Sequence, residues 1–236
     1  MKQILGALRR AVTDFDMIQD GDKIVVGISG GKDSMTLLYA LKLFQRFSSA
    51  KFDLCAVSID MGFENFDLSP VYEFCEKIDV PYKVIKTDIA KIVFDIRKES
   101  NPCALCANMR RGALHNTVNE LGFNKIALGH HADDAVETMF LSMLYEARIK
   151  TFKPVTYLDR KNIFNIRPLI YAKEKQVIAA VKKHDIPVVK SPCPMDKNTK
   201  REEVKQILNE ICKTIPEARD RVLKAINNKD NFELWW

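Results

Sequence analysis

The stretch Ser29-Gly30-Gly31-Lys32-Asp33-Ser34 separates two segments of very different pattern. Before it, residues 22–28 read DKIVVGI, a short run rich in β-branched residues that predicts a buried, parallel strand. After it, apolar residues recur at helical spacing over 35–44, which predicts an amphipathic helix. Adjacent glycines let the backbone turn sharply and approach a ligand closely. The sequence therefore predicts a strand–loop–helix unit with a ligand at the start of the helix.

This glycine loop (29–34) has the chemistry of a phosphate site. Free N–H groups at a helix start, together with the helix dipole, attract an anion. Lys32 adds a positive charge, and Ser29 and Ser34 can donate hydroxyl groups. The loop is not a Walker A loop, because Asp33 follows the lysine where Ser or Thr is required. A plain turn would not need these residues together, so we expect phosphate binding.

Strands and helices alternate on both sides of this unit. We expect strands at 54–59, 82–85 and 125–128, and helices at 3–18, 70–78, 103–121 and 132–145. This alternation predicts an α/β fold with a parallel, doubly wound sheet covered by helices on both faces. After residue 150 we expect a hairpin (155–158 with 163–166), a short strand at 188–189, and helices at 173–184, 200–213 and 216–227.

The domain organisation follows from this pattern. We expect an N-terminal helix (1–20), a ligand-binding domain (21–170) and a basic helical C-terminal extension (171–236) packed on the same domain. No run approaches the roughly 20 apolar residues that a membrane helix needs. With 47% apolar and 29% charged residues, we expect a soluble, cytoplasmic protein without a membrane partner.

Positive charge is concentrated in one part of the chain. Residues 1–147 hold 17 basic and 20 acidic residues, whereas residues 148–205 hold 15 and 6. A local basic face favours a polyanionic partner, with nucleic acid first. The alternative interpretation is a solvated, lysine-rich surface.

Three of the six cysteines stand out from the core pattern. Cys103 and Cys106 open a predicted helix, where the thiolate form is favoured. Cys193 lies between two prolines, which fix its backbone. Cys-x-x-Cys alone is compatible with a redox dithiol, half of a zinc site or coincidence. The remaining cysteines lie in apolar surroundings and are interpreted as core residues: Cys55, Cys75 and Cys212.

Two motifs resemble those of a known family. Ser-Gly-Gly-Lys-Asp-Ser resembles the signature of the ATP pyrophosphatase (PP-loop) family, and residues 129–134, Gly-His-His-Ala-Asp-Asp, resemble a segment of its tRNA-modifying members. The resemblance implies an adenine nucleotide α-hydrolase-like, Rossmann-like sheet that binds ATP with Mg²⁺ and adenylates a carbonyl-type oxygen. It implies nucleotide contacts at residues 29–34, Asp60 and Gly129. Of Asp133 and Asp134, we expect one to cap its helix and Asp134 to act, near Mg²⁺.

With the cysteines included, residues 20–212 resemble the tRNA 2-thiocytidine synthetase family. That resemblance implies that Cys103, Cys106 and Cys193 hold a [4Fe–4S] cluster with one open iron, where a hydrosulfide could bind. It also implies that one of Arg110 and Arg111 faces the cluster and the adenylate, and we assign this place to Arg110, with plain surface charge as the alternative. A three-cysteine zinc site and a persulfide-carrying cysteine remain open as rivals.

The hypothesis is an ATP-dependent tRNA sulfurtransferase that adenylates the C2 oxygen of a tRNA pyrimidine, with an anticodon-loop cytidine as the expected target. Sulfur would come from a cysteine desulfurase or from sulfide, and a homodimer is consistent with the resemblance. We expect tRNA phosphates at Lys150, Lys153, Arg160, Arg167, Lys197, Lys200 and Arg201, and base stacking on Phe152 or Trp235. The alternatives are a lysidine-type ligase, a 2-thiouridine-forming homologue and a non-catalytic iron–sulfur sensor that binds ATP.

Overall fold

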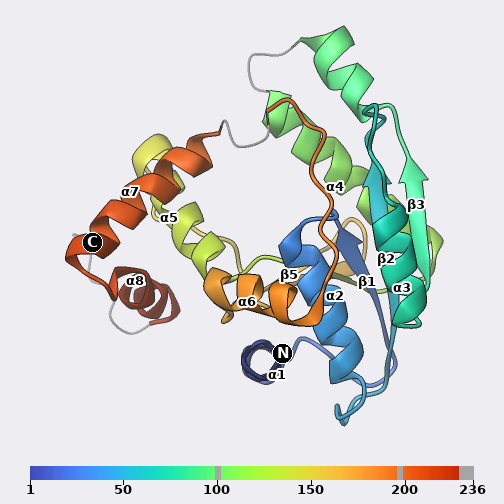
Figure 1. The fold of residues 1–236 in the computed structure, drawn as a ribbon, viewed down its shortest axis with the longest axis horizontal. Coiled ribbons are helices and arrows are strands. Elements are labelled where there is room, and N and C mark those ends of the chain that lie inside the picture. Colours follow the sequence, from blue (N-terminus) through green and yellow to red (C-terminus); the bar gives the residue numbers. More distant parts are fainter. Residues whose placement is uncertain (99–101, 196–198, 229–236) are drawn as a thin grey trace.

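The fold is described from a computed structural model that covers residues 1–98, 102–195 and 199–228 (Figure 1). The strands are β1 (Asp22–Ile28), β2 (Phe52–Asp60), β3 (Tyr82–Lys86), β4 (Lys125–Ala127), β5 (Val155–Leu158) and β6 (Ile163–Ile166). The α-helices are α1 (Lys2–Asp14), α2 (Lys32–Phe44), α3 (Ser69–Lys77), α4 (Pro102–Glu120), α5 (Ala132–Glu146), α6 (Glu174–His184), α7 (Lys200–Thr214) and α8 (Ala218–Asn227).

The strands form one sheet in the order β3-β2-β1-β4-β6-β5. All neighbouring pairs are parallel except β5 with β6, which form the predicted hairpin. The chain runs from β1 to β2 on one side and later returns to β4 on the other side of β1. The direction of winding therefore reverses between β1 and β4. In such sheets, ligands bind beyond the carboxyl ends of the strands at this reversal.

Alternate residues of β1 point into two different cores. Ile24 and Val26 are buried with α1, α2, α3 and α6 on one face of the sheet. Val25 is buried on the other face, where Val118 of α4 packs against it. The predicted doubly wound α/β fold is confirmed, with helices on both faces.

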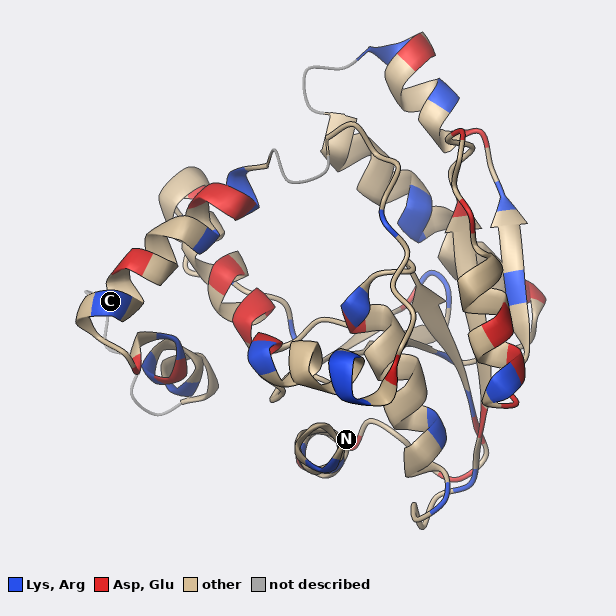
Figure 2. Ribbon diagram, viewed as in Figure 1, with Lys and Arg blue, Asp and Glu red and all other residues tan. Residues whose placement is uncertain are grey.

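Helices α5, α7 and α8 pack together beside the sheet (Figure 1). Their shared core includes Val136 of α5 with Val204 and Leu208 of α7. Helices α7 and α8 carry both basic and acidic residues, whereas the charged residues of α5 are all acidic (Figure 2). Many of the charges pair within the molecule, as Lys205 does with Glu174 at 2.8 Å. A distinctly basic C-terminal extension is therefore not confirmed.

Two local predictions differ from the structure. Residues 188–189 form no strand; Val189 N–H makes a hydrogen bond of 2.9 Å to the carbonyl of Gly30, so this segment only crosses the glycine loop. A π-helical turn, η1 (Lys91–Arg97), had no counterpart in the sequence pattern. Within the described ranges, no helix is long and apolar enough to cross a membrane.

Candidate active site

The glycine loop is held in shape by its own polar groups. Ser29 N–H donates to Ser34 Oγ at 3.2 Å, and Ser34 Oγ donates to the carbonyl of Gly31 at 3.1 Å. Gly30 has a φ of +80°, in the left-handed region that favours glycine. Its missing Cβ would also lie 3.0 Å from the Cβ of Val189. The loop is thus fixed before any ligand arrives.

The loop after β4 packs directly on the start of α2. A Cβ on Gly129 would lie 2.9 Å from the backbone of Asp33 and Ser34, so no larger residue fits without a shift. Gly129 also lines the cavity, so its expected contact with a nucleotide stays a prediction beside this contact with the backbone of α2. This contact fixes the two loops at the reversal point relative to each other.

Asp133 and Asp134 follow this loop, and the helix that each of them caps differs from the expectation. Asp134 Oδ2 accepts a hydrogen bond from His131 N–H at 2.9 Å and completes the capping box of α5. Asp133 Oδ2 accepts from Glu174 N–H at 2.7 Å, so it caps α6 instead of its own helix. Asp134 Oδ1 lies 3.6 Å from a terminal nitrogen of Arg201. The expectation that Asp133 would be the residue capping α5 is wrong, because α6 approaches it.

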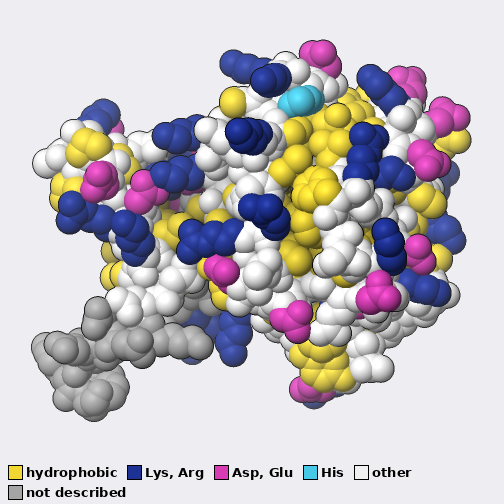
Figure 3. Space-filling model, turned by 90° about the horizontal axis from the view of Figure 1, so that it is seen from below, with side chains coloured by type: hydrophobic (Ala, Val, Ile, Leu, Met, Phe, Trp, Pro, Cys, Tyr) yellow, Lys and Arg dark blue, Asp and Glu magenta, His cyan; other side chains and the backbone are white. Residues whose placement is uncertain are grey.

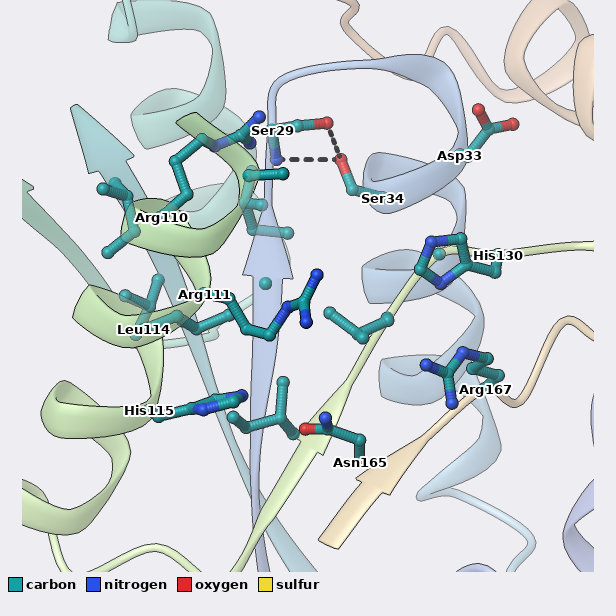
Figure 4. A pocket seen from close by; sticks show the side chains of 18 of the residues that line it. Ser29, Asp33, Ser34, Arg110, Arg111, Leu114, His115, His130, Asn165 and Arg167 are labelled. Carbon is teal, nitrogen blue, oxygen red and sulfur yellow. Dashed lines mark hydrogen bonds between the residues drawn. The ribbon is translucent and has the colours of Figure 1, made fainter. Parts of the chain in front are cut away.

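A cavity of about 700 Å³ lies between α4 and the carboxyl ends of the sheet (Figure 4). Ser29, Asp33, Ser34, Gly129 and Asp134 line it near the glycine loop. Opposite and below them, the polar lining comes mainly from α4 and β6: Arg110, Arg111, His115, Asn165 and Arg167. The sequence pointed to one of Arg110 and Arg111, and both line the cavity. His115 and Asn165 were not predicted, although the spacing of four between Arg111 and His115 places these two on one helix face.

His130 is one of two strongly perturbed groups of the cavity, and Arg167 is the other. Burial lowers the pKa of His130 to about 4, and Arg167 and Arg201 act in the same direction, while Asp134 opposes them. The imidazole is therefore neutral at neutral pH. Its Nδ1 is buried and has no hydrogen-bond partner among the described residues.

Four expected nucleotide contacts do not line the cavity: Gly30, Gly31, Lys32 and Asp60. Lys32 Nζ lies 3.0 Å from Asp33 and 3.2 Å from Glu174. Burial opposes its charge, but both carboxylates outweigh that effect and raise the pKa of Lys32. Asp60 Oδ1 accepts a hydrogen bond from Gly62 N–H at 2.9 Å and stabilises the turn after β2. Neither side chain is among those that line the cavity.

The three singled-out thiols lie near the start of α4. Cys103 is exposed, and Cys106 is half-buried with its sulfur 3.5 Å from that of Met61. The segment carrying Cys193 runs alongside α4 (Figure 1), and both Cys193 and Cys103 raise the pKa of Cys106. Burial is the largest cause of that rise and Arg110 opposes it, so the expected lowering by the helix start is not seen at Cys106.

The three thiols lie in the same region but do not form a complete metal site. Among the residues that the structure describes, no three His, Cys, Asp or Glu side chains are close enough to hold a metal ion. Arg110 lies one helical turn after Cys106 and lines the cavity. It also lowers the pKa of Cys106, against the effect of burial. That Arg110 faces both a cluster and the adenylate stays a prediction.

The expected RNA contacts divide into outer and inner groups. Lys150, Lys153, Arg160 and Lys200 are exposed, and Lys200 pairs with Glu203 at 2.9 Å. Arg167 instead lines the cavity, and Arg201 lies beside Asp134 and Thr138. Phe152 stacks on His130 at 4.9 Å, and Arg167 lies 4.9 Å above its ring. Lys197 and Trp235 lie outside the described residues. Figure 3 shows Lys and Arg spread over one face around an apolar patch.

This arrangement is that of a known class. The chain matches the PP-loop domain family over residues 4–211 and belongs to it. It is 39% identical over 229 residues to the tRNA-cytidine(32) 2-sulfurtransferase of Aliivibrio fischeri (strain MJ11), covering 96% of this chain and 75% of that protein. It is 36% identical to the enzyme of the same name from Geobacter sulfurreducens, covering 96% and 90%. The chain therefore belongs to the tRNA-cytidine(32) 2-sulfurtransferase family.

A solved structure shares the fold across nearly the whole chain. The U34-tRNA thiolase NcsA from Methanococcus maripaludis, described with its [4Fe-4S] cluster, superposes with a TM-score of 0.81. The match covers 98% of this chain and 79% of the thiolase at 24% sequence identity. At that identity the likeness concerns the fold.

Proposed function

We propose that this protein is an ATP-dependent tRNA sulfurtransferase that replaces the C2 oxygen of cytidine 32 with sulfur. The observation that carries the proposal is one cavity with a phosphate-binding loop at one end and a group of thiols near it. The names of the relatives supply the position of the nucleotide and the class of reaction. The sulfur donor, a desulfurase or sulfide, and a homodimer are part of the proposal.

The glycine loop and its neighbours would activate the base. N–H groups at the start of α2 and the hydroxyls of Ser29 and Ser34 would bind the phosphates of ATP. Asp134 would hold Mg²⁺, and Asp33 fits the same task, because its Oδ1 is buried with no hydrogen-bond partner among the described residues. The C2 oxygen then attacks the α-phosphate, and pyrophosphate leaves. Arg110 would neutralise charge on the phosphate of the adenylated base.

The thiols fit a cluster by their chemistry. Cys103, Cys106 and Cys193 offer three sulfur donors, the usual ligands of iron–sulfur clusters. When bound, a [4Fe–4S] cluster supplies an iron without a protein ligand at which sulfide is held. Cys106 has a raised pKa and would lose its proton when it becomes a ligand. In the balanced reaction, sulfide attacks C2 of the adenylated base and AMP leaves with the original oxygen.

The test uses anaerobically reconstituted full-length protein with ATP, Mg²⁺, sulfide and an anticodon stem-loop carrying C32. We expect one sulfur per RNA by mass spectrometry and one AMP per sulfur. A stem-loop with U32 is the matched control and should remain unmodified. AMP formation coupled to attachment of an amino acid would support a lysidine-type ligase instead, and the absence of AMP would reject catalysis.

A further inference from the structure

The cavity contains more positive charge than its own acids neutralise. Asp33 and Asp134 are the only acidic residues among those that line it. Asp33 pairs with Lys32, and Asp134 is engaged by His131 and Arg201. Within the described ranges, Arg110, Arg111 and Arg167 each have no carboxylate at ion-pair distance. Burial of Arg167 disfavours its unpaired charge, and this favours an anionic ligand beside it.

Two of these arginines lie away from the glycine loop. Figure 4 shows Ser29 and Ser34 at one end of the cavity with Arg110 near them, and Arg111 and Arg167 farther along, toward His115 and Asn165. Arg111 projects from α4, and Arg167 follows the last residue of β6. Arg111 lowers the pKa of both Arg167 and His115, which shows that the three side chains share one electrostatic environment.

Arg167 is held as a fixed donor. Its guanidinium lies 4.9 Å above the ring of Phe152, and one terminal nitrogen donates to the carbonyl of Lys153 at 2.6 Å. The Nε atom is buried and has no hydrogen-bond partner among the described residues. A planar guanidinium held in this way presents its remaining donors as a fork that matches a phosphate. Burial and Arg111 together lower the pKa of Arg167 to about 10, which means that its surroundings disfavour the charged form. A bound anion would stabilise that charge.

We propose that Arg111 and Arg167 form a second anion subsite, separate from the glycine loop, that binds an RNA backbone phosphate beside the target nucleotide. The inference rests on the proposed function. RNA is favoured over ATP as the source of the phosphate, because the start of α2 already offers the ATP phosphates their donors at the other end. A base in a single-stranded loop can be splayed out of its stack, and its flanking phosphate then enters the cavity with it.

The test measures binding of tRNA to the full chain across a range of salt concentrations, without ATP or sulfur donor. Arg111→Gln and Arg167→Gln should each weaken binding about tenfold at low salt. Each should also make the slope of log affinity against log salt shallower by about 0.7, the value for one lost phosphate contact on a single strand. The KM for ATP in AMP formation should stay within about twofold. Arg167→Lys should keep the slope but lose affinity, because charge remains and the fork is lost.

Arg9→Gln is the matched control. Arg9 is exposed on α1, on the opposite face of the sheet from α4, and this variant should bind tRNA like the unaltered protein. An unchanged slope with a raised KM for ATP would place the nucleotide phosphates at this subsite and overturn the proposal. An unchanged slope with an unchanged KM would also overturn it. Arg111 is exposed on its helix, so Arg111→Gln keeps the test valid if Arg167→Gln does not fold.

Failure of the proposed function would look different. Unaltered protein that binds tRNA with the expected salt slope but transfers no sulfur would contradict the sulfurtransferase reaction and leave the anion subsite in place.

Discussion

The site has a glycine-loop end, which lines the cavity, and a thiol end, the group of Cys103, Cys106 and Cys193 outside the cavity lining. The two are built in different ways. At the glycine loop, hydrogen bonds join Ser29, Gly31 and Ser34, and the backbone of Gly129 packs against α2 without space for a side chain. At the thiol end, Cys103 is exposed, and Cys106 has its sulfur contact with Met61. The nucleotide end is therefore preorganised by the backbone. The thiol end has its donors nearby but needs a bound group to draw them together.

Because the glycine loop is preorganised without the thiols, a thiol can be replaced without loss of AMP formation at the nucleotide end. Cys193→Ser should lower sulfur transfer to tRNA by more than about 100-fold, because one of the three proposed cluster ligands is lost. AMP formation should stay within about threefold, since the side chain of Cys193 makes no hydrogen bond to the glycine loop in the described part of the chain. Mass spectrometry of the RNA and a coupled AMP assay measure the two quantities in one sample.

Cys212→Ser is the control for this prediction, because Cys212 lies on α7 and was not singled out as a ligand. Sulfur transfer at the normal rate in Cys193→Ser would show that the chemistry does not depend on three thiols. An equal loss of AMP formation would show that the two ends are not separable.

The opposite change should damage the preorganised end. Gly129→Ala places a methyl group 2.9 Å from the backbone of Asp33 and Ser34. Backbone cannot yield as a side-chain tip can, so we expect a loss of about 1–3 kcal/mol in the free energy of unfolding, with slower AMP formation. Urea unfolding and the AMP assay measure these effects.

Gly112→Ala gives a matched comparison, since nothing lies within 4 Å of the added carbon at this position in α4. That variant should gain about 0.5–1 kcal/mol, because alanine is the better helix former. Equal stability of Gly129→Ala and the unaltered protein would mean that the contact between the two loops is not rigid.

The sequence allowed the prediction of what local patterns determine. The β-branched run before Ser29 and the glycines after it are close in the chain, so the strand, loop and helix could be inferred together. The direction of Arg167 could not, because it depends on the pairing of β6 with β4, which lie far apart in sequence. The same applies to Asp133, which caps α6 only because the fold brings Glu174 to it. The raised pKa of Cys106 likewise comes mainly from burial, which no helix-start rule contains.

The titration of His130 tests whether the nucleotide end is shielded from water. The pKa of His130 is lowered from an ordinary 6.5 to about 4, chiefly by burial. Between these values the unfolded chain binds a proton that the folded chain does not, so protonation favours unfolding. The contribution to stability is therefore fully present above about pH 6.5 and is lost as the pH falls toward 4.

From about pH 7 to about pH 5, the unaltered protein should lose about 1–2 kcal/mol more free energy of unfolding than His130→Gln. Urea unfolding of both proteins at the two pH values gives the difference. Glu174, whose pKa is lowered to about 2, titrates below this window and does not interfere. Equal losses in the two proteins would mean that His130 reaches water and takes up protons freely. The glycine-loop end would then be as open as the thiol end, and the contrast between them would fail.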